Sequence, residues 1–205
     1  MEKKYDLYEL SVDEETLGMY AVSLVETPAM LKKWLAFSKE ERERRAVKLS
    51  IQDEEKHKVL GPILRADFPV YRYDDWGEYY IVWRKPEIEK ITRMFLLKGF
   101  QEAVNLDHNP DNYLDNGEIE IEQLFIKNSA MGLNPVGFED IEEGSLFAIY
   151  KVKSEALWKK IKAGEWNGFS MEGYYRYTPV GKVGEEANEN TERKWEKFLS
   201  EVAGQ

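Results

Sequence analysis

The chain contains no cysteine among its 205 residues. It can therefore form no disulfide framework, no thiolate zinc site and no cysteine nucleophile, and a reducing compartment is permitted. Any nucleophilic chemistry must come from serine, threonine or water.

Long apolar runs and an excess of basic residues are also missing. The longest apolar runs, such as "MFLL" and "YYIVW", are much shorter than the roughly 20 apolar residues that span a bilayer. The first ten residues, "MEKKYDLYEL", contain no apolar signal core. The 29 basic residues are outnumbered by 39 acidic ones, giving a net charge of −10 that repels nucleic acid and favours basic protein partners. We expect a soluble intracellular protein with no membrane or nucleic-acid partner.

The pattern of apolar and turn-forming residues predicts many short strands and few helices. Residues 5–12 and 19–26 are typical of a strand pair, with a hairpin as one arrangement. "KPEIEKITRMFLLKG" predicts a helix with Pro86 in its first turn and Ile88, Ile91, Phe95 and Leu96 at helical spacing, and "EALWKKIKAG" predicts a second helix. The interspersed strands indicate an α+β fold with a mixed or antiparallel sheet, closed or strongly curved.

The candidates for serine chemistry are few, because the chain has only two histidines. His57 lies in the charged stretch "DEEKHKVL", which favours a surface position. His108 follows the strand-like "AVNL" on a polar turn, where a histidine taken alone is more often structural than catalytic. Ser170 lies in "EWNGFSMEGYY", where the spacing G-x-S-x-x-G and the helix-to-strand direction both disfavour the nucleophile elbow of α/β-hydrolases.

A calcium loop is a competing interpretation of the segment around His108. Its acidic and polar residues fall at EF-hand ligand positions, but Asn112 replaces the usual glycine, Pro110 interrupts the loop, and the exit "GEIEIEQLF" alternates like a strand. The ligand positions are Asp107, Asn109, Asp111, Tyr113, Asp115 and Glu118. We therefore predict no metal site and no cofactor, and keep a calcium-binding module as the less favoured alternative.

Two segments together resemble the active-site segments of phage prohead maturation proteases, which share their fold with herpesvirus assemblins. "NLDH" matches the histidine segment, and "LWKKIKAGEWNGFSMEGYY" matches the helix and strand that deliver the serine. The resemblance covers about residues 57–177. It implies an assemblin-like small β-barrel with surrounding helices, with Ser170 as nucleophile and His108 as general base.

A third family motif, "(E/D/H)-V-S-L-V-x-x-P-A", ordinarily follows the serine, but here it occurs as "MYAVSLVETPAM" at residues 19–30. The resemblance thus implies a circular permutation, which a fold tolerates when the original termini lie close together. The position expected to orient the histidine is Ala21, which has no polar side chain. Ser23 shares a strand face with Ala21, and Glu172 shares a face with Ser170, so these two are the candidates for a third catalytic member.

The resemblance also implies the domain layout. We expect a protease domain over residues 1–178 and a flexible linker with a terminal helix over residues 179–205. The ranges within the protease domain are a permuted strand and helix at 1–37, a charged linker at 38–58, and a core with the histidine and serine motifs at 59–178.

The function implied by the resemblance is phage prohead maturation. The protein would be a serine endopeptidase that cleaves scaffold and major capsid proteins inside the procapsid, in the host cytoplasm, with a homodimer as a further candidate assembly. The alternative is a catalytically silent capsid-assembly protein with the same fold, and Ala21 is the residue that favours it.

Overall fold

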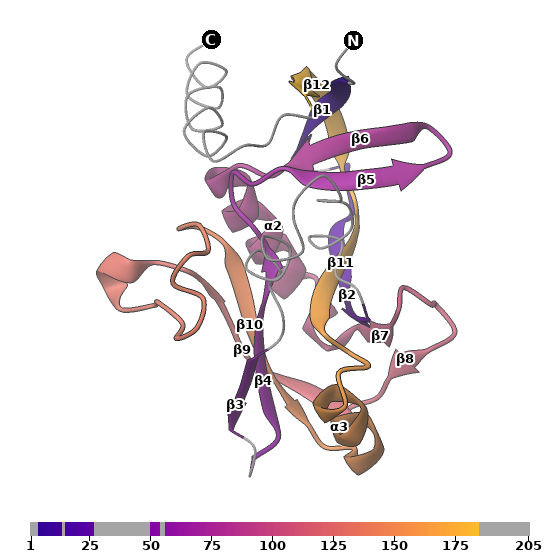
Figure 1. The fold of residues 1–205 in the computed structure, drawn as a ribbon, viewed down its shortest axis with the longest axis vertical. Coiled ribbons are helices and arrows are strands. Elements are labelled where there is room, and N and C mark those ends of the chain that lie inside the picture. Colours follow the sequence, from indigo (N-terminus) through magenta and orange to yellow (C-terminus); the bar gives the residue numbers. More distant parts are fainter. Residues whose placement is uncertain (1–3, 14, 27–49, 54–55, 185–205) are drawn as a thin grey trace.

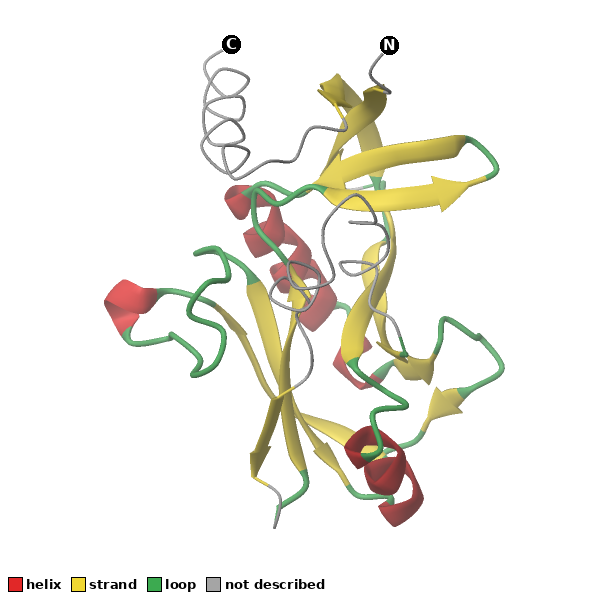
Figure 2. Ribbon diagram, viewed as in Figure 1, coloured by secondary structure: helices red, strands yellow, loops and turns green. Residues whose placement is uncertain are grey.

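The computed structural model describes residues 4–13, 15–26, 50–53 and 56–184, and three four-stranded sheets organise this part of the chain (Figures 1 and 2). The first sheet has the order β12-β1-β6-β5 and mixes an antiparallel β12–β1 pair with a parallel β1–β6 pair. Its strands are β1 (Lys4–Ser11), β5 (Val70–Asp74), β6 (Gly77–Val82) and β12 (Arg176–Gly184).

The second sheet is antiparallel throughout and has the order β3-β4-β10-β9. Strand β10 is apolar along most of its length, and its burial fits a central position between β4 and β9. The strands are β3 (Ser50–Asp53), β4 (Lys58–Leu64), β9 (Ile119–Ile126) and β10 (Leu146–Val152).

The third sheet carries the predicted catalytic segments and has the order β11-β2-β7-β8. Strand β2 is almost wholly buried, and it pairs antiparallel with β11 and parallel with β7. The strands are β2 (Gly18–Val25), β7 (Val104–Leu106), β8 (Tyr113–Leu114) and β11 (Gly168–Tyr174). The strand from the N-terminal part of the chain therefore lies between the strands that carry the serine and precede the histidine.

Two α-helices are described, and both match the sequence prediction. Helix α2 (Lys85–Leu97) begins with Pro86 in its first turn and buries Ile88, Ile91 and Phe95, whereas Leu96 is half exposed. Helix α3 (Glu155–Lys162) is capped by the Ser154 hydroxyl, which accepts a hydrogen bond from the Leu157 backbone nitrogen. Two short 3₁₀ helices, η2 (Phe100–Glu102) and η3 (Ser129–Met131), complete the helical elements of the described residues.

One large apolar core joins the three sheets to both α-helices. Leu24 of β2, Tyr150 of β10 and Phe169 of β11 are each at most 1% exposed, and they belong to the same cluster as Phe95 of α2 and Trp158 of α3. Burial of side chains of this size contributes about 1.5–3 kcal/mol each. The face of β11 that carries Phe169 and Met171 is therefore buried in this core, which holds the strand of Ser170 in place.

The predicted α+β fold, a small closed barrel with surrounding helices, is wrong. Each sheet has two edge strands, and no ladder among the described residues joins one edge to the other, so the sheets stay open and strands predominate over helices. The predicted hairpin of residues 5–12 and 19–26 is also wrong, because β1 and β2 pair in different sheets. Each of these strands has two other partners, so both of its edges are occupied.

The predicted linker boundaries also shift. Residues 50–53 form β3, although we expected a charged linker over 38–58, and β12 continues to Gly184 beyond the predicted domain end at 178. Pairing with β4 and with β1 accounts for these extensions, because each added residue gains ladder hydrogen bonds. The remainder of the 38–58 segment before residue 50, and the predicted terminal helix beyond residue 184, lie outside the described residues.

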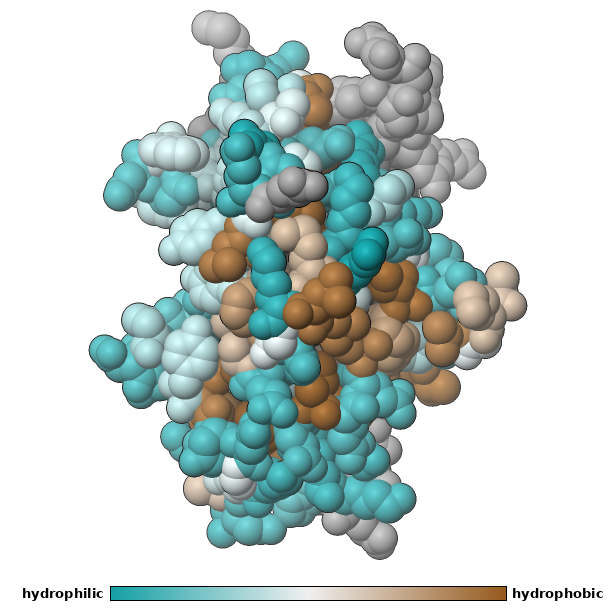
Figure 3. Space-filling model, turned by 180° about the vertical axis from the view of Figure 1, so that it is seen from behind, coloured by the Kyte–Doolittle hydropathy of each residue, from teal (hydrophilic) through white to brown (hydrophobic). Residues whose placement is uncertain are grey.

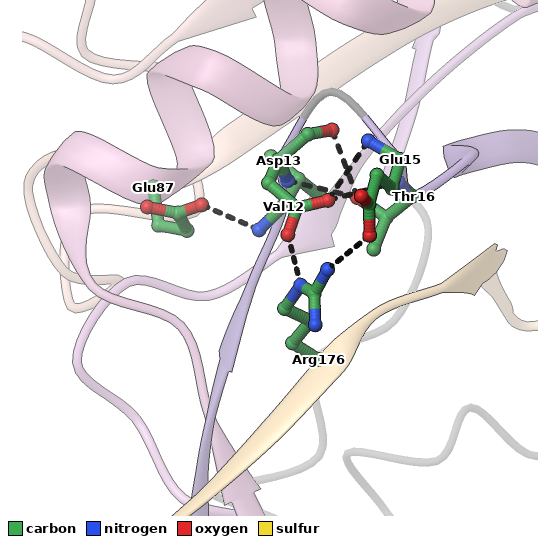
Figure 4. A network of polar contacts seen from close by, with 6 residues as sticks. All are labelled: Val12, Asp13, Glu15, Thr16, Glu87 and Arg176. Atoms are coloured by element: carbon green, nitrogen blue, oxygen red, sulfur yellow. Dashed lines mark hydrogen bonds and ion pairs between the residues drawn. The ribbon is translucent and has the colours of Figure 1, made fainter.

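A polar network fixes the turn between β1 and β2 (Figure 4). Arg176 of β12 donates hydrogen bonds to the carboxylates of Asp13 and Glu15. Desolvation raises the pKa of Asp13, but the contact with Arg176 and the hydrogen bonds from two backbone N–H groups lower it more. The net pKa of Asp13 is therefore below its usual value. On the other side of the turn, Glu87 of α2 accepts a 2.6 Å hydrogen bond from the Val12 backbone nitrogen. The turn that follows β1 is thus tied to both α2 and β12.

We expect Glu87→Ala to lower the free energy of unfolding by about 1–3 kcal/mol, because the Val12 N–H would be left buried without an acceptor. Urea denaturation of the purified variant measures this loss. Glu89→Ala is the matched control, since Glu89 is exposed on the same helix and alanine favours helix formation. Equal stabilities of the two variants would contradict the assigned role of Glu87.

No helix in the described part of the chain is long and apolar enough to cross a bilayer. The back face of the molecule carries apolar residues across its middle, with mainly hydrophilic residues above and below (Figure 3).

Candidate active site

The third sheet places Ser170 of β11 directly opposite Ser23 of β2. Directly opposed residues of an antiparallel pair have Cβ atoms about 4.5–5.5 Å apart and point to the same face. Glu172 lies two residues further along β11 and shares that face, as alternation predicts. On the other edge of β2, Ser23 pairs with Asn105 of β7, so four polar side chains meet on one side of this sheet.

His108 reaches this cluster from the turn after β7. Its Nδ1 atom lies 3.1 Å from the Ser23 hydroxyl oxygen and 3.4 Å from Oε1 of Glu172. The turn is tight: Asp107 and His108 have φ values of 54° and 58°, and the Asp107 N–H donates to the Leu24 carbonyl of β2. Two consecutive left-handed residues without glycine are costly, at about 1–2 kcal/mol each. The surrounding hydrogen bonds hold the ring over the sheet despite this cost.

The hydrogen bonds define the direction of the contacts. Ser23 Oγ lies 2.6 Å from both Glu172 Oε1 and Asn105 Oδ1, and the Asn105 amide donates to Glu172 Oε1 at 2.5 Å. A hydroxyl has one hydrogen, and a carboxylate only accepts. When Ser23 donates to Glu172, its oxygen is free to accept from His108 Nδ1–H. This assigns the tautomer and leaves Nε2 as the basic nitrogen.

Glu172 is ionised at neutral pH in this setting. Partial burial raises the pKa of Glu172. The hydrogen bonds from Ser23 and Asn105, the nearby His108 ring and the Tyr20 hydroxyl lower this pKa by more, so it lies below the usual value of a glutamate. Tyr20 donates to Oε2 of Glu172 at 3.3 Å. In return, burial and the Glu172 charge raise the pKa of Tyr20 to about 12. The carboxylate is therefore held by three donors.

Lowering the pH should weaken this cluster. Since the pKa of Glu172 is lower in the folded chain than the ordinary value of 4.5, the unfolded state binds more protons between the two values. The contribution of Glu172 to stability is complete above pH 4.5 and is lost as the pH falls through the lowered pKa. We expect Glu172→Gln to flatten this part of the stability profile, measured by urea denaturation at a series of acidic pH values. Parallel profiles for variant and wild type would contradict the expectation.

Burial differs among the members of the site. Ser23 and Asn105 are fully buried, Ser170 is 5% exposed, and the His108 side chain is 43% exposed. Among the described residues, the Ser170 hydroxyl makes no hydrogen bond to His108. Ser170 also lines a pocket bounded by β4, β5 and Trp83, so a small opening lies beside it.

The other sequence candidates lie elsewhere. His57 stacks on Trp158 of α3 with ring centroids 4.6 Å apart, and its Nδ1 atom lies 3.9 Å from Glu155. In the described part of the chain, no three or more histidine or acidic side chains gather to hold a metal ion. The calcium-loop segment instead forms β8 at Tyr113, while Asn109 and Asp115 accept hydrogen bonds from the backbone of their own turns.

Sequence reasoning missed Asn105. It stands in a short apolar strand between Val104 and Leu106, three residues before His108, and is fully buried. A single amide in an otherwise apolar strand was the available signal, because buried polar side chains need partners. Here the partners are Ser23 and Glu172.

Comparison with known proteins agrees with this serine-centred site. Residues 47–178 match a family described as "Putative phage serine protease XkdF". Searches of curated proteins and of solved structures each returned no match. The matched range includes His108 and Ser170, whereas Ser23 lies before it. Because the match spans more than half of the 205 residues, the chain belongs to this family of phage serine proteases.

Proposed function

We propose that the protein is a prohead maturation serine endopeptidase, with Ser170 as nucleophile and His108 as general base. One observation carries the proposal: Ser170 lies opposite Ser23, and the Ser23 hydroxyl and the Glu172 carboxylate together hold Nδ1 of His108. This arrangement supplies a nucleophile, a base and groups that orient the base, as serine hydrolysis requires.

The proposed reaction proceeds through an acyl-enzyme. Ser170 Oγ attacks the scissile carbonyl carbon while His108 Nε2 takes its proton, and Ser23 and Glu172 stabilise the resulting imidazolium through Nδ1. The tetrahedral intermediate collapses as the imidazolium protonates the leaving amine. Water then attacks the ester with His108 again acting as base, which releases the acid and restores Ser170. Ser23 and Glu172 are positioning residues, since they act on the base and not on the substrate.

Glu172 takes the place that Ala21 leaves empty. The two residues are direct partners across β11 and β2, so a carboxylate from β11 can reach the space where a polar residue of β2 was expected. The circular permutation remains a prediction, but β2 does lie between β11 and β7, where an orienting strand is needed.

The proposed substrates are the scaffold and the extensions of the major capsid protein, cleaved inside the procapsid in the host cytoplasm. The phage protease family and the resemblance of the Ser170 and His108 segments to prohead proteases support this assignment. The test is co-expression with the capsid and scaffold proteins encoded beside this chain, followed by mass spectrometry of new termini. We expect new termini with wild type and none with Ser170→Ala or His108→Ala.

A catalytically silent assembly protein is the second candidate. This candidate is favoured because the Ser170 hydroxyl makes no hydrogen bond to His108 in the described part of the chain. Co-expression separates the two functions. Absence of processing by wild type, with normal capsid assembly, would favour the silent protein, and processing that persists in both variants would exclude the proposed catalytic pair.

A further inference from the structure

Two exposed tyrosines border the proposed catalytic cluster on the same face of the third sheet. Tyr174 follows Glu172 by two residues on β11, so its side chain shares the face of Ser170. Tyr113 of β8 is the direct partner of Asn105 on β7, and opposed residues of an antiparallel pair point to one face. Tyr174 is 64% exposed and Tyr113 is 46% exposed, so both rings are accessible from solvent.

A β-bulge brings a third tyrosine, Tyr20, to this face. Strict alternation would point Tyr20 into the core with Val22, but the register of β2 against β11 shifts beside Glu172 and leaves Tyr20 without a direct partner. Such bulges redirect side chains and are frequent next to active sites. The Tyr20 hydroxyl accordingly donates to Glu172, and its ring centroid lies 5.5 Å from that of Tyr174. Burial and the Glu172 charge raise the pKa of Tyr20, and the neighbouring Tyr174 and Tyr113 also contribute. Tyr20, Tyr113 and Tyr174 thus form one tyrosine surface.

The charges around the tyrosine surface favour a cation. Residues 99–126, which supply β7, β8 and the turn between them, contain several acidic residues and no lysine or arginine. Glu172 adds a carboxylate at the edge of the tyrosine surface. Two basic side chains towards the start of β2 are engaged elsewhere: Arg176 donates to two carboxylates, and Lys98 donates to a backbone carbonyl at 2.9 Å. Because the faces of aromatic rings are also electron-rich, this surface attracts cations.

We propose that the tyrosine surface binds an arginine or lysine side chain of the substrate polypeptide, about three or four residues away from the scissile bond. The separation follows from strand geometry. Tyr174 lies four residues along β11 from Ser170, and Tyr113 lies three strand spacings away, so both are about 13–14 Å from the nucleophile. An extended peptide covers about 3.3 Å per residue. The inference rests on the proposed protease function.

A binding experiment tests the tyrosine surface without requiring catalysis. The Ser170→Ala protein is titrated with an alanine peptide that carries arginine near both ends, and with the same peptide carrying citrulline, which resembles arginine in shape but has no charge. We expect the arginine peptide to bind about fivefold more tightly or better, since each exposed ring contributes about two- to fivefold to the affinity for a cation. Equal affinity for the two peptides would overturn the tyrosine surface.

Substitutions in the same Ser170→Ala protein locate the preference. Replacing Tyr113 and Tyr174 together by leucine should remove the preference for arginine, whereas replacing both by phenylalanine should keep it, because phenylalanine retains the ring. Tyr73→Leu is the matched control, since Tyr73 is 74% exposed on β5 in another sheet. A preference for arginine that survives the double leucine substitution would place the cation elsewhere and contradict the proposal.

A cleavage experiment separates this inference from the proposed function. The wild-type protein digests a peptide library, and the cleaved sites are mapped by mass spectrometry. We expect lysine and arginine to be enriched about three or four residues from the cut, and the double leucine variant to lose this enrichment. Cleavage without the enrichment overturns the tyrosine surface and leaves the protease. Arginine-dependent binding without any cleavage supports the tyrosine surface and counts against the protease.

Discussion

Ser170→Ala is expected to abolish proteolysis, with kcat lower by roughly 10⁴- to 10⁶-fold, as when a triad nucleophile is removed from other serine proteases. Stability should change little, since the Ser170 hydroxyl has no hydrogen-bond partner among the described residues and alanine fits the same strand. Cleavage of the co-expressed capsid and scaffold proteins, and thermal unfolding of the purified variant, measure the two effects.

Ser23 provides the matched comparison, because it stands directly opposite Ser170 on β2. Unlike the Ser170 hydroxyl, the Ser23 hydroxyl is within hydrogen-bonding distance of His108, 3.1 Å from Nδ1. Ser23→Ala should lower kcat by only about 10- to 100-fold, the effect of losing one hydrogen bond to a charged group. A fluorophosphonate probe should label wild type and Ser23→Ala but not Ser170→Ala. The reverse labelling pattern would make Ser23 the nucleophile and contradict the assignment.

Glu172→Gln is expected to lower kcat by about 10²- to 10⁴-fold while leaving KM close to the wild-type value, since Glu172 orients the base and does not bind the substrate. The amide keeps the size of the side chain but loses the charge that favours protonated imidazole during the reaction. The acid limb of the kcat/KM profile should therefore also move to lower pH.

A kinetic series over pH with one peptide substrate checks both parts of this expectation. Glu165→Gln is the control, because Glu165 lies just before β11 and is exposed, with Lys160 4.0 Å away. A Glu172→Gln enzyme with wild-type kcat and an unchanged profile would leave Ser23 as the residue that orients His108.

Local features of the fold were predictable from sequence because their causes are local. Pro86 and the spacing of Ile88, Ile91 and Phe95 defined α2, and the Ser154 cap defined the start of α3. Sheet membership depends on contacts between distant residues. The hairpin expected for residues 5–12 and 19–26 failed because β1 and β2 each find partners more than 50 residues away.

The alternation of side chains along a strand allowed part of the candidate site to be predicted from the sequence. It predicted that Glu172 shares a face with Ser170 and that Ser23 shares a face with Ala21. It could not show that the two faces coincide, because this depends on the register that sets Ser170 opposite Ser23. The pocket beside Ser170 could not be predicted for the same reason, since its walls come from β4, β5, β11 and Trp83.

The catalytic groups cannot assemble while the chain is still being made. Ser23 precedes Glu172 by 149 residues, and a ribosome that adds about 5–20 residues per second needs roughly 7 to 30 seconds to cover that distance. During this interval β2 lacks the strand that supplies both the nucleophile and the carboxylate. A nascent chain therefore cannot form the proposed site until synthesis has passed Glu172.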